Sequence, residues 1–235
     1  MTSILSSVKQ ELIANADEKT KQSGQRFFKE AVNLYGVKTA TVTQIAKKYF
    51  QEIKTKDKHE VFALCDQLWQ SGMMEESFIA CNWSYAKHNE FTLDDFPIFT
   101  SWVNKYVSNW AACDTLCNHT IGSLVERNPE LITELKKWAK SDNRWVKRAS
   151  SVSLIIPAKK GLFLAEIFQI ADILLLDPDD MVQKGYGWLL KEASRAHQQQ
   201  VFEYVIKNKK NMPRTALRYA IEKMPTNLKQ EAMKK

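Results

Sequence analysis

The nine residues SDNRWVKRA, at positions 141–149, recur in altered form as DPDDMVQKG at positions 177–185, 36 residues later. Both stretches open with polar or acidic residues that suit a helix N-terminus. The same spacing relates three further series of residues, one of which contains only small side chains. These series are Met74, Trp110, Val146 and Val182; Ser77, Cys113, Ala149 and Gly185; and Ala80, Leu116, Val152 and Trp188. A small residue at a constant position indicates that one helix of each pair approaches its neighbour closely.

The rest of the chain also has a helical pattern. Apolar residues recur three and four positions apart, as in Val61, Leu64, Cys65, Leu68 and Trp69. With 7 Gly and 6 Pro among 235 residues, a glycine-rich β sandwich is disfavoured. A helical repeat of this length is typical of HEAT or armadillo solenoids. We therefore predict an all-α, HEAT-like helical-repeat solenoid in which residues 1–235 form a single curved domain. The alternative is chance matching of apolar residues in another all-α protein.

The sequence also predicts the compartment and the redox state. The N-terminus has no basic region followed by an apolar one, and no apolar run reaches the roughly 18 residues of a membrane helix. We expect a cytoplasmic protein, nucleoid-associated in a prokaryote, that does not bind a membrane. Cys65, Cys81, Cys113 and Cys117 lie in apolar helical patterns, which favours reduced, buried thiols. Cys113, Cys117 and His119 match no common zinc module, so we predict neither a metal nor a cofactor.

The net charge of +7 is segregated along the chain. Residues 131–160 contain eight basic and two acidic residues, residues 201–235 contain nine and three, and residues 61–100 contain one and six. Basic blocks of this kind suggest a polyanionic partner, most often nucleic acid, although a solubilising surface has the same composition. The concave face of a solenoid suits a DNA duplex, and it equally suits an acidic protein or peptide.

Two pairs of residues have helical spacing and side chains suited to binding. Trp110 and Asp114 share one helix face, where an indole and a carboxylate together suit a cation. Arg144 and Arg148 share another face and can contact adjacent phosphate oxygens, unless that face is simply solvated. Ordinary core packing is the alternative for each Trp. The sequence contains no P-loop, dinucleotide-binding, serine-hydrolase or zinc-protease motif.

Two glycines, Gly185 and Gly187, fall within one predicted helical turn next to Trp188. Each Gly in a helix interior costs about 1 kcal/mol relative to Ala. Either close helix packing or a bulky group lying against the backbone would account for them.

Three segments together resemble the AlkD-type HEAT-like-repeat DNA glycosylases of the DNA alkylation repair family. The segment SNWAACDTLC, residues 108–117, looks like the family's Trp-x-x-x-Asp helix. The segment SDNRWVKRAS, residues 141–150, resembles its Arg-bearing helix, and VQKGYGWLLKE, residues 182–192, is similar to its Gly-Trp helix. The order and spacing of the three agree with the family over nearly the whole chain.

The resemblance implies a role for each matched residue. Trp110 and Trp188 match the two indoles that line the family's cleft, Asp114 its catalytic carboxylate and Arg148 its DNA-contacting arginine. The residues expected to bind DNA are Arg148, Arg144, Lys147, Lys184 and Lys191. We expect the four matched residues to line one groove, with the basic blocks on the same side. In the 36-residue register, Trp110 and Asp114 fall about 200° around the helix from Arg148, taking about 100° per residue. We therefore expect either that the register slips by a residue or two or that the repeats are irregular.

The function implied is that of a monofunctional glycosylase that removes cationic N3- or N7-alkylated purines from double-stranded DNA. In that reaction Asp114 would stabilise the oxocarbenium ion and position water. We expect a monomer without an obligate protein partner. A non-catalytic, structure-selective DNA-binding protein and a protein-interaction solenoid are the alternatives.

Overall fold

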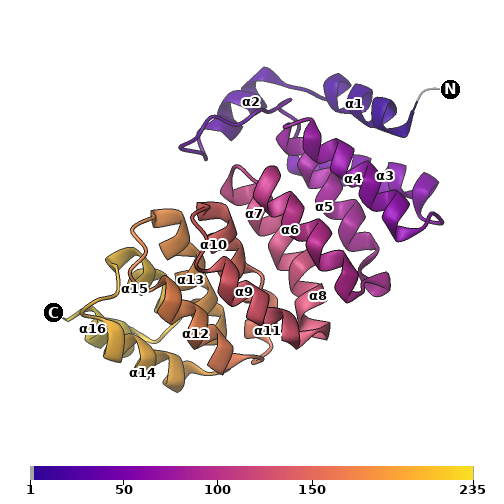
Figure 1. Ribbon diagram of the computed structural model, residues 1–235. Helices are drawn as coiled ribbons and strands as arrows, with labels where there is room; N and C mark the ends of the chain where they lie inside the picture. The colour runs from indigo at the N-terminus through magenta and orange to yellow at the C-terminus, as the bar shows by residue number, and fades with distance from the viewer. Residues whose placement is uncertain (1–2, 235) are drawn as a thin grey trace. The chain divides into compact units, whose positions relative to one another are not determined.

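The computed structural model describes residues 3–234, and within that range the regular structure is helical (Figure 1). The only β pairing among these residues is an isolated bridge between Asn33 and Met73. The predicted all-α, helical-repeat class is therefore confirmed. The chain divides into two compact units, Met1–Leu116 and Cys117–Lys235, which we call unit 1 and unit 2.

Unit 1 is built from helices that pack mainly on their neighbours in the chain. Helix α5 is its centre, because α3, α4 and α7 all pack on it, and α1 packs on α3. The Trp83 indole of α5 donates a hydrogen bond of 2.8 Å to the backbone carbonyl of Ala46 on α3. The helices are α1 (Ile4–Ala14), α2 (Glu18–Gln25), α3 (Thr39–Ile53), α4 (Lys58–Gln70), α5 (Met74–Ala86), α6 (Phe96–Lys105) and α7 (Trp110–Thr115).

Unit 2 is centred on α13, which packs against α10, α11, α12 and α15. A π-helical segment, Leu116–Ile121, connects α7 to α8. The helices of the unit are α8 (Gly122–Arg127), α9 (Ile132–Trp138), α10 (Arg144–Val152), α11 (Ile155–Lys159), α12 (Leu164–Leu174), α13 (Asp180–Ala193), α14 (Gln198–Asn208), α15 (Arg214–Ala220) and α16 (Thr226–Met233).

Helix N-caps define the register of the repeat. The side chains of Asn109, Asn143 and Asp179 each accept a backbone N–H from the first turn of α7, α10 and α13 respectively. The caps of α10 and α13 are 36 residues apart, as the repeat predicts, whereas those of α7 and α10 are 34 apart. The expected slip is thus two residues. It places Asp114 and Arg148 at the same position, five residues after the cap of their respective helices.

Close helix packing explains the paired glycines of α13. A Cβ atom on Gly187 would lie 2.7 Å from the Cβ atom of Tyr219, on α15. On Gly185 it would lie 2.9 Å from the Oγ atom of Ser151, on α10. The two glycines therefore allow α13 to approach a different helix on each side.

All four cysteines are free and buried, in agreement with the prediction of buried thiols. They are Cys65, Cys81, Cys113 and Cys117. Burial raises the pKa of the Cys65 and Cys81 thiols above the ordinary value. These side chains act as small apolar core residues.

We expect Gly187→Ala to lower the free energy of unfolding by about 1–3 kcal/mol, because the added methyl group would overlap α15. Urea denaturation followed by circular dichroism measures the change. Gly24→Ala in α2 is the control, since its Cβ atom would meet only the flexible end of Leu34, at 3.1 Å. A Gly187→Ala protein as stable as the wild type would contradict the close packing.

Candidate functional site

Trp110 and Asp114 lie one turn apart on α7, in unit 1, and both side chains are half-buried. The helix begins at Trp110 because the buried Asn109 side chain accepts the backbone N–H of Ala112 at 2.9 Å. This cap satisfies a backbone donor that the first turn of a helix leaves unpaired. It places the indole in the first turn and the carboxylate in the next.

Two contacts hold the Trp110 indole in place. The ring stacks on Phe28 with 5.4 Å between centroids and 24° between planes. The indole N–H donates a hydrogen bond of 3.3 Å to the backbone carbonyl of Phe27. Phe27 and Phe28 come shortly after the end of α2 at Gln25, so the segment between α2 and α3 fixes the orientation of an aromatic side chain on α7.

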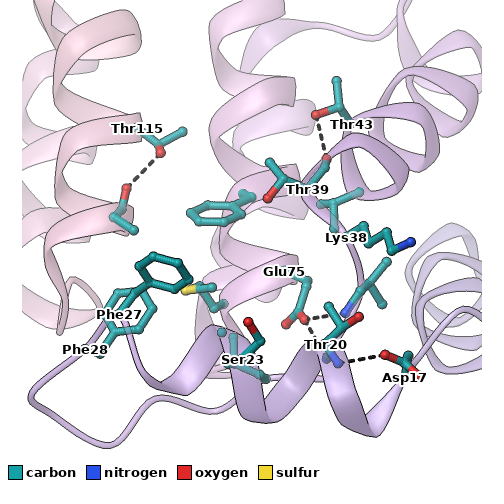
Figure 2. A pocket seen from close by; sticks show the side chains of 18 of the residues that line it. Asp17, Thr20, Ser23, Phe27, Phe28, Lys38, Thr39, Thr43, Glu75 and Thr115 are labelled. Carbon is teal, nitrogen blue, oxygen red and sulfur yellow. Dashed lines mark hydrogen bonds between the residues drawn. The ribbon is translucent and has the colours of Figure 1, made fainter.

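A cavity of about 790 Å³ lies beside Trp110 within unit 1 (Figure 2). Its walls come from α2, α3, α5, α7 and the segment between α2 and α3. In Figure 2, Phe27 and Phe28 lie on one side of the cavity, and Lys38 and Thr39 lie on the other. Helix α7 contributes Trp110 and its neighbours to the lining, while Asp114 lies outside it. The cavity is thus mainly aromatic on one side and polar on the other.

The buried carboxylate of Glu75 holds one wall of this cavity. It accepts backbone N–H groups from Tyr35 at 3.1 Å, Gly36 at 2.8 Å and Val37 at 3.1 Å, and Glu75 is 2% exposed. A buried charge is tolerated when hydrogen bonds replace its hydration, as they do here. Next to it, the Tyr35 hydroxyl donates to Glu76 at 2.6 Å. Burial and this hydrogen bond raise the pKa of Tyr35.

In unit 2, Arg148 lies on α10 and Trp188 on α13. Arg148 is only 5% exposed, and its Nη1 group donates to the backbone carbonyl of Met181 at 2.6 Å. Its side chain crosses Gly185, where a Cβ atom would lie 3.3 Å from the Arg148 Cγ atom. Trp188 is half-buried, and its indole N–H donates to Glu192 at 3.3 Å. Gly185 thus makes room for the arginine as well as for the helix that bears it.

The other four basic residues expected to bind DNA each form an ion pair inside unit 2. Arg144 pairs with Asp179 at 2.8 Å, Lys184 with Asp180 at 3.1 Å, and Lys191 with Glu222 at 3.1 Å. Lys147 pairs with Asp177 at 2.5 Å. Three of the four partners therefore belong to the acidic run at the start of α13, with Asp177 and Asp179 before the helix and Asp180 as its first residue. These ion pairs were not predicted from the sequence.

Comparison with known proteins identifies the family. The model of a family described as DNA alkylation repair enzyme matches residues 8–224. The chain belongs to the DNA alkylation repair family. Membership confirms the predicted resemblance and makes DNA the expected partner of this repair enzyme.

A solved structure with the same fold bears the description of a predicted DNA alkylation repair enzyme from Enterococcus faecalis. It matches with a TM-score of 0.80 and 16% sequence identity, over 90% of this chain and 98% of that one. At that identity, the likeness shows a shared fold. No curated protein gives a significant sequence match.

Two further properties bear on the expected partners. Within residues 3–234, no helix is both long enough and apolar enough to cross a membrane. Over the same range, no group of three or more His, Cys, Asp and Glu side chains is arranged to hold a metal ion. Cys113 and Cys117 lie in the core, whereas His119 lies on the surface, so the three do not converge as zinc ligands.

The cavity, its Glu75 anchor and the Phe28 stack were not identified from the sequence. The available signal was the aromatic pair Phe27–Phe28, flanked by Arg26 and Lys29 in an otherwise polar segment. Aromatic residues among basic ones are typical of nucleic-acid contacts. No such signal existed for Glu75, because its partners lie about 40 residues earlier and share no helical spacing with it.

We expect Glu75→Gln to destabilise unit 1 by about 1–3 kcal/mol, because an amide has one acceptor oxygen where the backbone presents three donors. Thermal unfolding of the purified protein measures the loss. Glu76→Gln is the matched control, since its amide oxygen still accepts from the Tyr35 hydroxyl. Equal stability of the two variants would show that the Glu75 contacts contribute little.

Proposed function

We propose that this DNA alkylation repair enzyme is a monofunctional glycosylase, which hydrolyses the N-glycosidic bond of cationic N3- or N7-alkylated purines in duplex DNA. The observation that carries the proposal is the half-buried carboxylate of Asp114, one helical turn from an indole that two contacts hold in place. Family membership supplies the substrate class, because it makes DNA alkylation damage the target.

The chemistry requires a negative charge rather than a strong acid. Alkylation at N3 or N7 makes the purine cationic, so the base is already a good leaving group. What remains is to stabilise the positive charge that develops on the sugar and to position the attacking water. Asp114 is proposed to do both. Partial burial strengthens its interaction with that charge, because water screens it less.

Trp110 is proposed to contact the sugar and the backbone beside the lesion. An aromatic face attracts a developing cation, and a ring held by Phe28 and by the Phe27 carbonyl loses little freedom when it binds. Trp188 is proposed to play the same part from α13, on the strength of the resemblance. Arg148 is proposed to contact a phosphate through the small part of its side chain that remains exposed.

We expect Asp114→Asn to slow the excision of N7-methylguanine by about 10²–10³-fold, while binding to undamaged DNA changes little. Asparagine keeps the shape of the side chain and removes its charge, which acts mainly in the transition state. The measurement is single-turnover release of base at saturating protein, alongside a binding titration. Arg148→Ala is the contrasting variant and should weaken binding as well as turnover.

Two results would overturn parts of this proposal. A wild-type protein that binds DNA tightly but releases no alkylated base would be a non-catalytic DNA-binding protein. An Asp114→Asn protein that excises as fast as the wild type would exclude Asp114 as the catalytic group, while leaving the glycosylase activity in place.

The ion pairs of unit 2 provide a test of the proposed DNA-binding residues. Hydrogen bonding to Lys191 holds the pKa of the Glu222 carboxyl below its usual value, so this acid stays charged beside the lysine at neutral pH. If Lys191 contacts DNA, Glu222→Gln removes both a competitor for the lysine and a charge that repels phosphate.

We therefore expect Glu222→Gln to bind duplex DNA more tightly than the wild type at low salt. Its log affinity should fall more steeply with log salt, because the slope grows by about 0.9 for each additional phosphate neutralised. Glu231→Gln is the matched control, since it changes the net charge equally on an exposed residue of α16. Identical salt slopes for the two variants would remove Lys191 from the set of DNA-binding residues.

A further inference from the structure

The Trp188 indole is oriented by a different kind of contact from the one that orients Trp110. An indole has a single hydrogen-bond donor, its N–H group. The N–H of Trp110 donates to a backbone carbonyl in the segment between α2 and α3. The N–H of Trp188 donates at 3.3 Å to the carboxylate of Glu192, which lies one turn further along the same helix, α13. The orientation of this ring therefore depends on an acidic side chain.

Glu192 is buried, which is uncommon for a glutamate. The residue is 8% exposed, whereas Lys184, Trp188 and Lys191 on the same helix are half-buried. Their spacing of four and three residues places these three side chains on one face of α13. Glu192 lies about 40° around the helix from Trp188, taking about 100° per residue, and so forms the edge of that face. The carboxylate is thus shielded from water beside residues that are expected to bind DNA.

Arg195 occupies the second oxygen of this carboxylate. The Arg195 Nε–H group donates to Glu192 Oε2, while the Trp188 indole donates to Oε1. The backbone N–H of Arg195 also donates to the backbone carbonyl of Glu192 at 3.2 Å. Each carboxylate oxygen therefore has a partner, and the guanidinium group balances the charge of a buried acid. A carboxylate paired in this way keeps a fixed position and repels an approaching phosphate less.

These contacts have two effects on the Trp188 ring. They restrict its side chain to one orientation before DNA binds, so that little freedom is lost on binding. They also polarise the indole, because an anionic acceptor draws the N–H proton toward itself and increases the electron density of the ring. A ring face with more electron density attracts a cation more strongly. Both effects favour contact with a sugar that becomes positively charged.

We propose that Glu192 is a positioning residue, which holds and polarises the Trp188 indole for contact with the DNA beside the lesion. Glu192 acts through the indole and does not itself contact DNA, and Arg195 keeps its carboxylate in place. The inference rests on the proposed function, because that function gives Trp188 its contact with the sugar.

The first test records the indole N–H groups of isotopically labelled protein by nuclear magnetic resonance. Loss of one peak in Trp188→Phe identifies the Trp188 signal. Glu192→Met keeps the length of the side chain without an acceptor, so we expect this signal to move upfield. Glu192→Gln should move it less far, because a neutral amide oxygen accepts a weaker hydrogen bond than a carboxylate does.

Glu203→Met is the matched control. Glu203, on α14, is exposed and accepts a hydrogen bond of 2.8 Å from Gln199, also four residues earlier in its helix. This variant therefore removes the same charge and a hydrogen bond of the same spacing from a different helix. It should leave both the Trp188 signal and the rate of base release unchanged.

The second test measures single-turnover release of N7-methylguanine at saturating protein. We expect Glu192→Met to slow release about tenfold, the factor that one hydrogen bond of ordinary strength supplies, with a DNA affinity equal to that of Glu203→Met. Glu192→Gln should recover most of the rate. In a Trp188→Phe background, which has no N–H to hold, Glu192→Met should have little further effect.

Three results would overturn the inference. One is a Trp188 signal that does not move in Glu192→Met, and another is a wild-type rate of release in that variant. The third is an equal loss of rate in the wild-type and Trp188→Phe backgrounds, which would mean that Glu192 supports the fold of α13 rather than the indole. Should Glu192→Met fail to fold by circular dichroism, the same comparisons are made with Glu192→Ala, and the Glu192→Gln spectrum still shows whether the carboxylate holds the indole.

Failure of the proposed function would give a different pattern. A wild-type protein that releases no base would overturn the glycosylase activity. The positioning role is then decided by titration with undamaged duplex DNA. A Trp188 signal that moves on adding DNA to the wild type, but not on adding it to Glu192→Met, would support the role, and any other pattern would overturn it.

Discussion

Three capping interactions determine where the proposed functional side chains lie on their helices. Asn109, Asn143 and Asp179 each accept a backbone N–H with their side chains and thereby fix the first residue of α7, α10 and α13. Counted from these caps, Asp114 and Arg148 occupy the same position in different helices. A cap supplies an acceptor that no helical residue can supply, so the start of each helix, and every side-chain position after it, depends on a single polar side chain. The proposed carboxylate and the proposed phosphate-contacting arginine thus each lie five residues after a capping side chain, one in unit 1 and the other in unit 2.

Much of the helical arrangement could be predicted from the sequence. The apolar spacing predicts helices throughout, because helix formation depends on neighbours in the chain. The paired glycines left two explanations open, close packing or a bulky group against the backbone, and the contacts of α13 with α10 and α15 favour close packing. The sequence predicted a register slip or irregular repeats, but not the size of the slip between α7 and α10, which is two residues. Apolar residues can be matched at several registers, whereas a capping hydrogen bond fixes a single register. The cavity of unit 1 could not be predicted. Its wall depends on the hydrogen bonds from Tyr35, Gly36 and Val37 to Glu75, and no periodicity relates residues so far apart in the sequence.

The ion pairs of unit 2 likewise could not be read from residue counts along the chain. The basic residues of α10 belong to the strongly positive segment 131–160, whereas the acids before α13 lie after this segment in the sequence. In unit 2 the two are partners, because Asp177 and Asp179 pair with Lys147 and Arg144. The effective charge of this block is therefore smaller than its formal charge. A phosphate that approaches these side chains competes with carboxylates already in place, which favours ligands that offer several phosphates at once.

The buried thiols have a consequence for an enzyme of alkylation repair. Alkylating agents are electrophiles, and the cysteine species that reacts with them is the thiolate. All four cysteines are free and buried, and burial raises the pKa of the Cys65 and Cys81 thiols. A buried thiol that keeps its proton is a poor nucleophile and is hard for a reagent to reach. The cysteines of this protein are therefore poor targets for the reagents whose damage to DNA its family repairs.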